Sequence, residues 1–101
     1  MEIRNLNNSP KVPFNLEAFI LHTEQRIEII HITIKSGESL DKHKNPFDVI
    51  FFVISGTGIL SIDNEDFKLS QNDTIKITSE KNRGWLNNSD SDLQLLVVKL
   101  L

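Results

Sequence analysis

Residues 37–58 read GESLDKHKNPFDVIFFVISGTG, and this segment sets the pattern for the whole chain. Its apolar run at residues 49–54 is β-branched and aromatic and is bounded by turn residues, which predicts a strand buried on both faces. Side chains alternate along a strand, so one face would be shared by His43, Asn45, Phe47, Val49, Phe51 and Val53. We expect any active site to lie on that face.

Short apolar segments separated by turns make up the rest of the chain. Residues 26–35, RIEIIHITIK, place their alternate isoleucines on one face and His31 on the other, at the surface or in an interface. We expect further strands at residues 19–22, 59–62, 67–69, 74–78 and 93–100, with another opening at residue 85, although residues 14–25 also fit a short helix. Residues 1–15 contain Pro10 and Pro13 and predict an N-terminal arm that packs on the domain or on a neighbouring molecule. This pattern predicts an all-β antiparallel sandwich or barrel.

Composition restricts the class of protein. The chain has 101 residues, a net charge of -3 and no cysteine, which fits one domain spanning residues 1–101. It has no block of Lys and Arg, which disfavours a nucleic-acid surface because phosphate binding needs clustered cations. The lack of cysteine excludes disulfides, thiolate metal sites and a cysteine nucleophile. No apolar segment has the length of a signal peptide core or a membrane span, so we expect no membrane partner and a cytoplasmic protein.

The spacing of glycine, histidine and asparagine resembles the first motif of the cupin superfamily. That motif runs Gly, five residues, His, one, His, three or four, Glu, six, Gly. Here these places are occupied by Gly37, His43, Asn45, Val49 and Gly56.

A second segment is similar to the second cupin motif, which runs Gly, five residues, Pro, one, Gly, two, His, three, Asn. Here the matching places are occupied by Asn72, Thr78, Glu80, Arg83 and Asn87. The resemblance extends over about residues 27–98 and implies a small double-stranded β-helix barrel of the jelly-roll type.

The resemblance also implies where a metal would bind. Metal-binding cupins use the two His and the Glu of the first motif and the His of the second, and this chain keeps only His43. Asn45 would offer a carbonyl oxygen, Val49 offers nothing, and Arg83 is a cation that repels a divalent metal. We therefore predict no cofactor, with His43 and Asn45 as the candidate ligands if a divalent metal does bind.

The presence of Arg83 favours an anionic ligand instead of a metal ion. If the alignment holds, its guanidinium lies near His43, and Trp85 follows on the same strand face. Such a fork of donors suits a carboxylate or a phosphate, so we predict metal-independent binding of a small anionic organic molecule. The predicted ligand-binding residues are His43, Asn45, Phe47, Val49, Phe51, Arg83 and Trp85. In the alternative interpretation, Arg83 is exposed in a charged loop and pairs with Glu80 or solvent.

Two other functions remain open at this point. The chain would be an enzyme if His43 acts as an acid or base, as in an isomerase-like cupin, or if it binds a metal weakly. It would be a structural or regulatory dimer if Trp85 and Phe51 fill the lumen. The apolar outer face of the central strand predicts a homodimer in either case, with Ile50, Phe52 and Ile54 as the contact residues.

Overall fold

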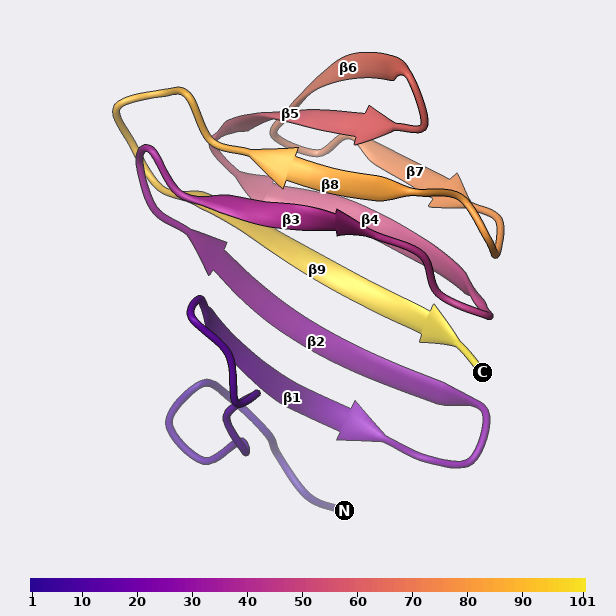
Figure 1. The fold of residues 1–101 in the computed structure, drawn as a ribbon. Coiled ribbons are helices and arrows are strands. Elements are labelled where there is room, and N and C mark those ends of the chain that lie inside the picture. Colours follow the sequence, from indigo (N-terminus) through magenta and orange to yellow (C-terminus); the bar gives the residue numbers. More distant parts are fainter.

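The computed structural model describes residues 1–101 as nine β-strands without a helix (Figure 1). The strands are β1 (Glu17–Thr23), β2 (Ile27–Ile34), β3 (Ser39–His43), β4 (Asp48–Ser55), β5 (Thr57–Ile62), β6 (Glu65–Ser70), β7 (Thr74–Ile77), β8 (Arg83–Leu86) and β9 (Leu93–Leu100). A five-stranded sheet has the order β1-β2-β9-β4-β7 and a four-stranded sheet the order β3-β8-β5-β6. All pairings are antiparallel, and the predicted all-β jelly-roll barrel is confirmed.

The inner faces of the two sheets form one core. Alternate residues of β2, β4 and β9 are buried there, because every second side chain of a strand points to the same face. Trp85 of β8 crosses from the smaller sheet and meets Phe51 of β4 edge-on, with ring centroids 5.4 Å apart and an angle of 82° between the planes. The two sheets are therefore joined by an aromatic contact at the centre of the barrel.

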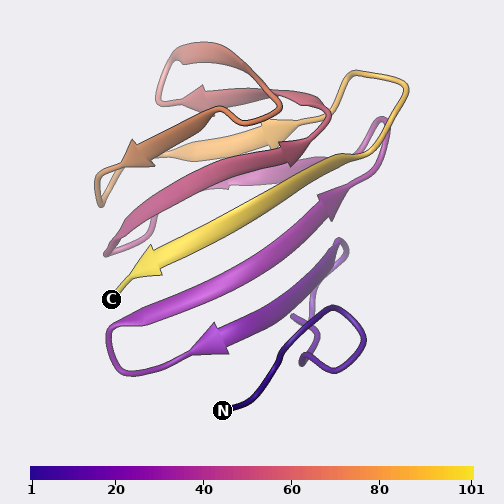
Figure 2. The ribbon, with the colours of Figure 1, turned by 180° about the vertical axis from the view of Figure 1, so that it is seen from behind.

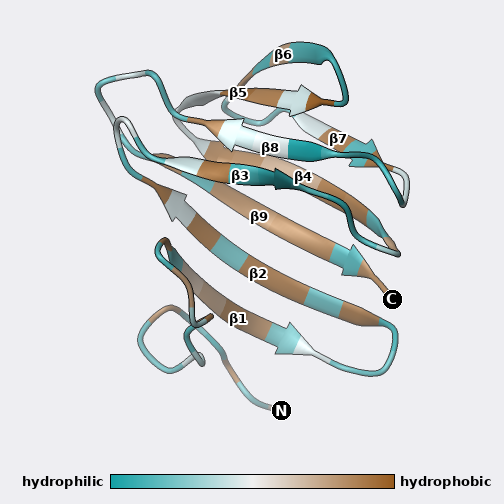
Figure 3. Ribbon diagram, viewed as in Figure 1, coloured by the Kyte–Doolittle hydropathy of each residue, from teal (hydrophilic) through white to brown (hydrophobic).

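The central strand differs from its prediction in burial. Its inner residues Val49, Phe51 and Val53 are buried, whereas Ile50, Phe52 and Ile54 on the outer face are only half-buried. Within one chain the predicted burial is met only on the inner face, because the smaller sheet covers only that side. Figure 3 shows the apolar character of β2, β4 and β9, which are adjacent strands of the larger sheet.

Three further features departed from the sequence pattern. The polar segment Ser39–His43 forms β3, although it has no apolar alternation. Strand β8 begins at Arg83 instead of residue 85, so Arg83 belongs to the sheet and not to a charged loop. His31 is 7% exposed, because its register partners Phe19 and Leu96 flank it on the neighbouring strands.

The N-terminal arm, residues 1–15, packs on β1. Lys11 forms an isolated antiparallel bridge with Phe19, the Val12 amide donates to the Ala18 carbonyl at 2.8 Å, and the Ile20 amide donates to the Pro10 carbonyl at 2.8 Å. Figure 2 shows the arm beside β1, at the edge of the larger sheet. No helix of the structure has the length and apolar character needed to cross a lipid bilayer.

Asn87 organises the loop between β8 and β9. Its side chain is fully buried, and Nδ2 donates to the carbonyls of Ile34 at 2.8 Å and Ser91 at 2.7 Å. Its Oδ1 accepts from the amide of Ser89 at 3.0 Å and from the Ser89 hydroxyl at 2.7 Å. One amide side chain thus supplies partners for polar groups of a loop and of β2, which belong to different parts of the chain.

We expect Asn87→Ala to lower the free energy of unfolding by about 2–3 kcal/mol, because the buried carbonyl of Ile34 loses its donor. Urea denaturation measures this change. The exposed neighbour Asn88 provides the control, since Asn88→Ala should stay within about 0.5 kcal/mol of the wild type. Equal losses for the two variants would contradict the role given to Asn87.

Candidate functional site

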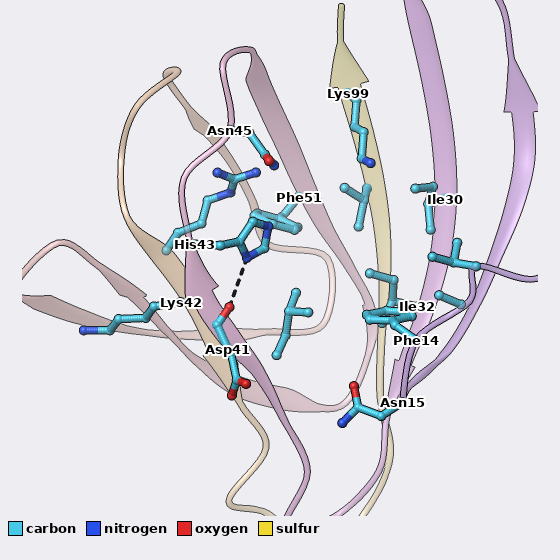
Figure 4. Close-up of a pocket in the computed structure, with 15 residues that line it drawn as sticks. Phe14, Asn15, Ile30, Ile32, Asp41, Lys42, His43, Asn45, Phe51 and Lys99 are labelled. Atoms are coloured by element: carbon cyan, nitrogen blue, oxygen red, sulfur yellow. Dashed lines mark hydrogen bonds between the residues drawn. The ribbon is translucent and has the colours of Figure 1, made fainter.

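A cavity of about 350 Å³ lies between the two sheets and is partly open to solvent (Figure 4). Its walls come from both sheets and from the N-terminal arm. The lining residues are Val12, Phe14, Asn15, Ala18, Ile30, Ile32, Leu40, Asp41, Lys42, His43, Asn45, Phe51, Arg83, Val97 and Lys99. This volume is within the usual range for a small-molecule site.

Strands β3 and β8 bring His43 and Arg83 together. The two residues are register partners, and an irregularity in β3 between Leu40 and His43 precedes them. Gly84 makes this arrangement possible, because a Cβ at that position would lie 2.7 Å from the Leu40 carbonyl oxygen and 2.9 Å from the Lys42 amide nitrogen. Any other residue would force β3 away from β8 and would move His43 relative to Arg83.

Arg83 is a buried cation without a carboxylate partner. It is 3% exposed, and no acidic side chain lies within ion-pair distance of it. The hydrogen-bonding environment of Asn45 orients its amide so that Oδ1 accepts from Arg83 Nη2 while Nδ2 donates to the Lys44 carbonyl at 3.1 Å. Arg83 Nε has no partner. Burial lowers the pKa of the guanidinium below its ordinary value, but an arginine remains protonated at neutral pH.

His43 is exposed at the cavity wall and has a defined orientation. Its Nδ1 lies 3.0 Å from the carbonyl oxygen of Asp41. A carbonyl oxygen can only accept, so Nδ1 carries the proton and Nε2 keeps a free lone pair in the neutral ring. Figure 4 shows this contact, with the Asp41 carboxylate directed away from the ring. The imidazole is therefore available as a hydrogen-bond acceptor or a base at Nε2.

The other cations of the cavity already have partners. Lys99 enters from β9, on the other side of the cavity from His43 and Asn45, and its Nζ lies 3.5 Å from a carboxylate oxygen of Glu28 (Figure 4). The same Nζ lies 5.6 Å from the centre of the Phe47 ring. Lys42 points away from these residues, and its Nζ donates to the Asp63 carbonyl at 3.2 Å.

Four of the predicted ligand-binding residues line the cavity, namely His43, Asn45, Phe51 and Arg83. The other three, Phe47, Val49 and Trp85, do not line it. Val49 and Trp85 are 1% and 2% exposed in the packed core, and Phe47 packs against that core. The single regular strand that was predicted from His43 to Val53 was wrong, because β3 ends at His43 and β4 begins at Asp48 in the other sheet. Val49 and Phe51 do share the inner face of β4, but alternation along a strand does not give the depth at which a side chain lies in the barrel.

Two points that the sequence left open are decided by the structure: the direction of the Arg83 side chain and whether aromatic side chains fill the lumen. Arg83 faces the lumen, because its strand neighbour two positions on, Trp85, occupies the core on the same face. Trp85 and Phe51 do not fill the lumen, so the occluded barrel of the dimer hypothesis is absent from the structure. The sequence reasoning missed Lys99, which the alternation with buried Leu95 and Val97 on β9 would have placed inward.

The residues present do not fit a divalent metal. No group of three or more His, Cys, Asp or Glu side chains converges anywhere in the chain. His43 supplies one imidazole and Asn45 one amide oxygen that already accepts from Arg83, which is fewer than the three or four protein ligands of a firm site. The guanidinium of Arg83 adds a positive charge next to them. We therefore assign no chemical step to a metal.

Comparisons with known proteins agree with this architecture. The family model described as a cupin domain matches residues 30–99. No curated protein matches the sequence.

Solved structures similar to this chain span nearly its whole length. A predicted oxalate decarboxylase from Thermotoga maritima superposes with a TM-score of 0.88 at 16% identity, covering 99% of each chain. A Cupin 2 conserved barrel domain protein from Salinispora arenicola gives 0.85 at 21% identity, covering 100% of this chain and 89% of that chain. The polyketide cyclase RemF from Streptomyces resistomycificus gives 0.87 at 12% identity, covering 99% of this chain and 79% of that chain. At these identities the similarity shows the fold alone.

Proposed function

The chain belongs to the cupin domain family, and we propose that its function within that family is to bind a small organic anion in the cavity between its two sheets. The observation that carries this proposal is the guanidinium of Arg83, which is buried at the cavity wall without a carboxylate. A buried charge that lacks a partner is costly, and proteins keep such charges mainly where a ligand or a substrate completes them.

The donors around Arg83 support an anion more than a neutral molecule. Its Nε is unpaired, and Nη2 is held in place by Asn45, so the planar fork is fixed before a ligand arrives. A fixed fork loses little conformational entropy when it binds a carboxylate or a phosphate in a bidentate manner. His43, at the same wall, would contact a ligand through Nε2.

We expect a thermal-shift screen of benzoate, octanoate, gluconate, glucose 6-phosphate and inorganic phosphate to find at least one anion that stabilises the protein. At about 100 times its Kd, such a ligand adds about 2.7 kcal/mol, a rise on the order of 10 °C in Tm for a domain of this size. Arg83→Met should remove this shift without lowering the Tm of the ligand-free protein, since it deletes an unpaired buried charge.

Arg26→Met is the matched control, because Arg26 is exposed and does not line the cavity. This variant should keep the full ligand-induced shift. A screen in which no anion acts, or in which Arg83→Met responds as the wild type does, would overturn the proposal.

Acid-base catalysis by His43 is a second candidate function, favoured by the free lone pair at Nε2. The Asp41 carbonyl fixes the tautomer, and the anion site at Arg83 would hold a carboxylate next to this base. Proton abstraction beside a carbonyl group is the reaction class that such a pair would support.

We expect the protein to exchange the C3 protons of 2-oxooctanoate for deuterium in D2O faster than buffer does, as followed by NMR. His43→Gln should abolish this exchange, because the amide cannot act as a base. His22→Gln is the control, since His22 is exposed and pairs with Glu24 outside the cavity. Exchange at the rate of buffer in the wild type would eliminate catalysis of this class.

We also propose that two copies of the chain pair through the outer face of the larger sheet. On this face, β4 presents Ile50, Phe52 and Ile54, half-buried and apolar, between the central strand β9 and the edge strand β7. Ion pairs lie at two of its edges, Glu17 with Lys35 at 3.6 Å and Asp48 with Lys76 at 3.6 Å. Both edges carry both signs of charge, which suits a second copy of the same face better than a partner with charge of one sign.

We expect the wild type to elute as a dimer in size-exclusion chromatography with light scattering and Phe52→Glu to elute as a monomer. A carboxylate at the centre of a desolvated apolar patch would find no partner there. Phe67→Glu is the control, because Phe67 is an exposed phenylalanine on the smaller sheet and its substitution should leave the dimer intact. A monomeric wild type at micromolar concentration would refute this interface.

A further inference from the structure

We propose that the ligand of the cavity is a monocarboxylate with an apolar body, such as a medium-chain alkanoate or an aryl-substituted short acid. This inference rests on the proposed anion-binding function and adds the class of ligand to it. Three observations carry it: the separation of polar and apolar residues along the cavity, the number of unpaired charges in its wall, and its volume.

The polar side chains of the cavity are gathered mainly on one side, with Lys99 and Asn15 as the exceptions on the other (Figure 4). His43, Asn45 and Arg83 come from β3, the segment after it and β8, and they lie together. Figure 4 shows Ile32 and Phe14 apart from His43 and Asn45, on the side of β2 and the N-terminal arm. The apolar wall consists of Val12, Phe14, Ala18, Ile30, Ile32, Leu40, Phe51 and Val97. A ligand that fills the cavity therefore presents a charged group at one end and hydrocarbon at the other.

The apolar part has few hydrogen-bonding groups for a polar ligand body, because its one cation, Lys99, is paired with Glu28. Among the lining residues near the arm, only Asn15 offers a polar side chain, and it is exposed. Hydroxyl groups of a sugar acid would lose water in this region without gaining partners, at a cost for each unpaired group. A hydrocarbon body gains free energy from the same walls, since each buried methylene contributes favourably.

The charges of the wall favour a single negative charge on the ligand. Lys99 is neutralised by Glu28, and Lys42 points away to the Asp63 carbonyl. Arg83 remains as the one buried cation without a carboxylate partner, and Asp41 adds an exposed carboxylate to the cavity wall. One uncompensated positive charge matches one carboxylate, whereas a phosphate dianion or a dicarboxylate would bring a second negative charge with no cation to meet it.

The volume limits the size of the body. The cavity volume of about 350 Å³ is near the lower end of the range for small-molecule sites. We therefore choose probes with small bodies, such as octanoate and 3-phenylpropanoate.

Isothermal titration calorimetry with butanoate, hexanoate and octanoate tests this inference on the wild-type protein. We expect affinity to rise about fourfold for each added methylene. Gluconate and inorganic phosphate should bind at least tenfold more weakly than octanoate, because they lack the apolar body or carry a second charge. Arg83→Met should abolish the octanoate signal.

A matched pair on β9 tests the apolar wall. Val97 lines the cavity and Val98 points to the outer face of the same strand. Val97→Thr adds a hydroxyl to the wall at nearly constant volume and should weaken octanoate severalfold, whereas Val98→Thr should leave its affinity unchanged. If Val97→Thr does not fold, the calorimetric series of butanoate, hexanoate and octanoate on the wild type still tests whether the ligand body binds to an apolar wall.

The results of these titrations distinguish failure of the apolar-ligand inference from failure of the proposed anion-binding function. If gluconate or phosphate binds as tightly as octanoate and Arg83→Met abolishes that binding, the anion site stands and the apolar ligand is wrong. If affinity does not change from butanoate to octanoate, the apolar ligand is wrong as well. If no probe binds in a manner that depends on Arg83, both proposals fail.

Discussion

The edge-on contact between Trp85 and Phe51 is the interaction on which the barrel and its site depend. It joins the smaller sheet to the larger one across the core, with ring centroids 5.4 Å apart. Because Trp85 must point inward to make this contact, strand alternation turns Arg83, two residues earlier, into the same lumen. The packing of one aromatic side chain thus fixes the direction of the only buried cation, and the antiparallel pairing with β3 brings His43 to it.

The barrel can keep an unpaired guanidinium because the rest of its interior is consistently apolar. The core holds 15 buried hydrophobic residues, and their burial offsets the cost of a single poorly solvated group. Arg83 also lies in the cavity wall, where its Nη2 is stabilised by Asn45 instead of a carboxylate. An acidic partner at this place would stabilise the fold more, but it would remove the positive potential that the proposed function needs.

Much of the architecture could be predicted from the sequence, because alternating β-branched residues and turn signals specify strands without reference to the rest of the fold. The inward faces of β2, β4 and β9 follow this alternation. Strand β3 could not be found in this way, since SLDKH has no apolar alternation and pairs with β8 through its backbone. The burial of His31 also depends on neighbours from other strands, which a single strand pattern does not contain.

Only part of the candidate site could be predicted from the sequence, because the depth of a side chain in the barrel depends on the whole fold. Alternation along the central strand placed Phe51 inward, and the resemblance to the cupin motifs placed His43, Asn45 and Arg83 together, while Val49 and Trp85 lie too deep to reach the cavity. Val12 and Phe14 carried no signal, because they stand in an arm without regular structure and reach the cavity only through the turn of the chain into β1. Val12 is attached to β1 by a backbone hydrogen bond from its amide to the Ala18 carbonyl. Its side chain could therefore be exchanged without removing that bond, so the arm can alter one wall of the cavity while the pairing of β1 with β2 stays the same.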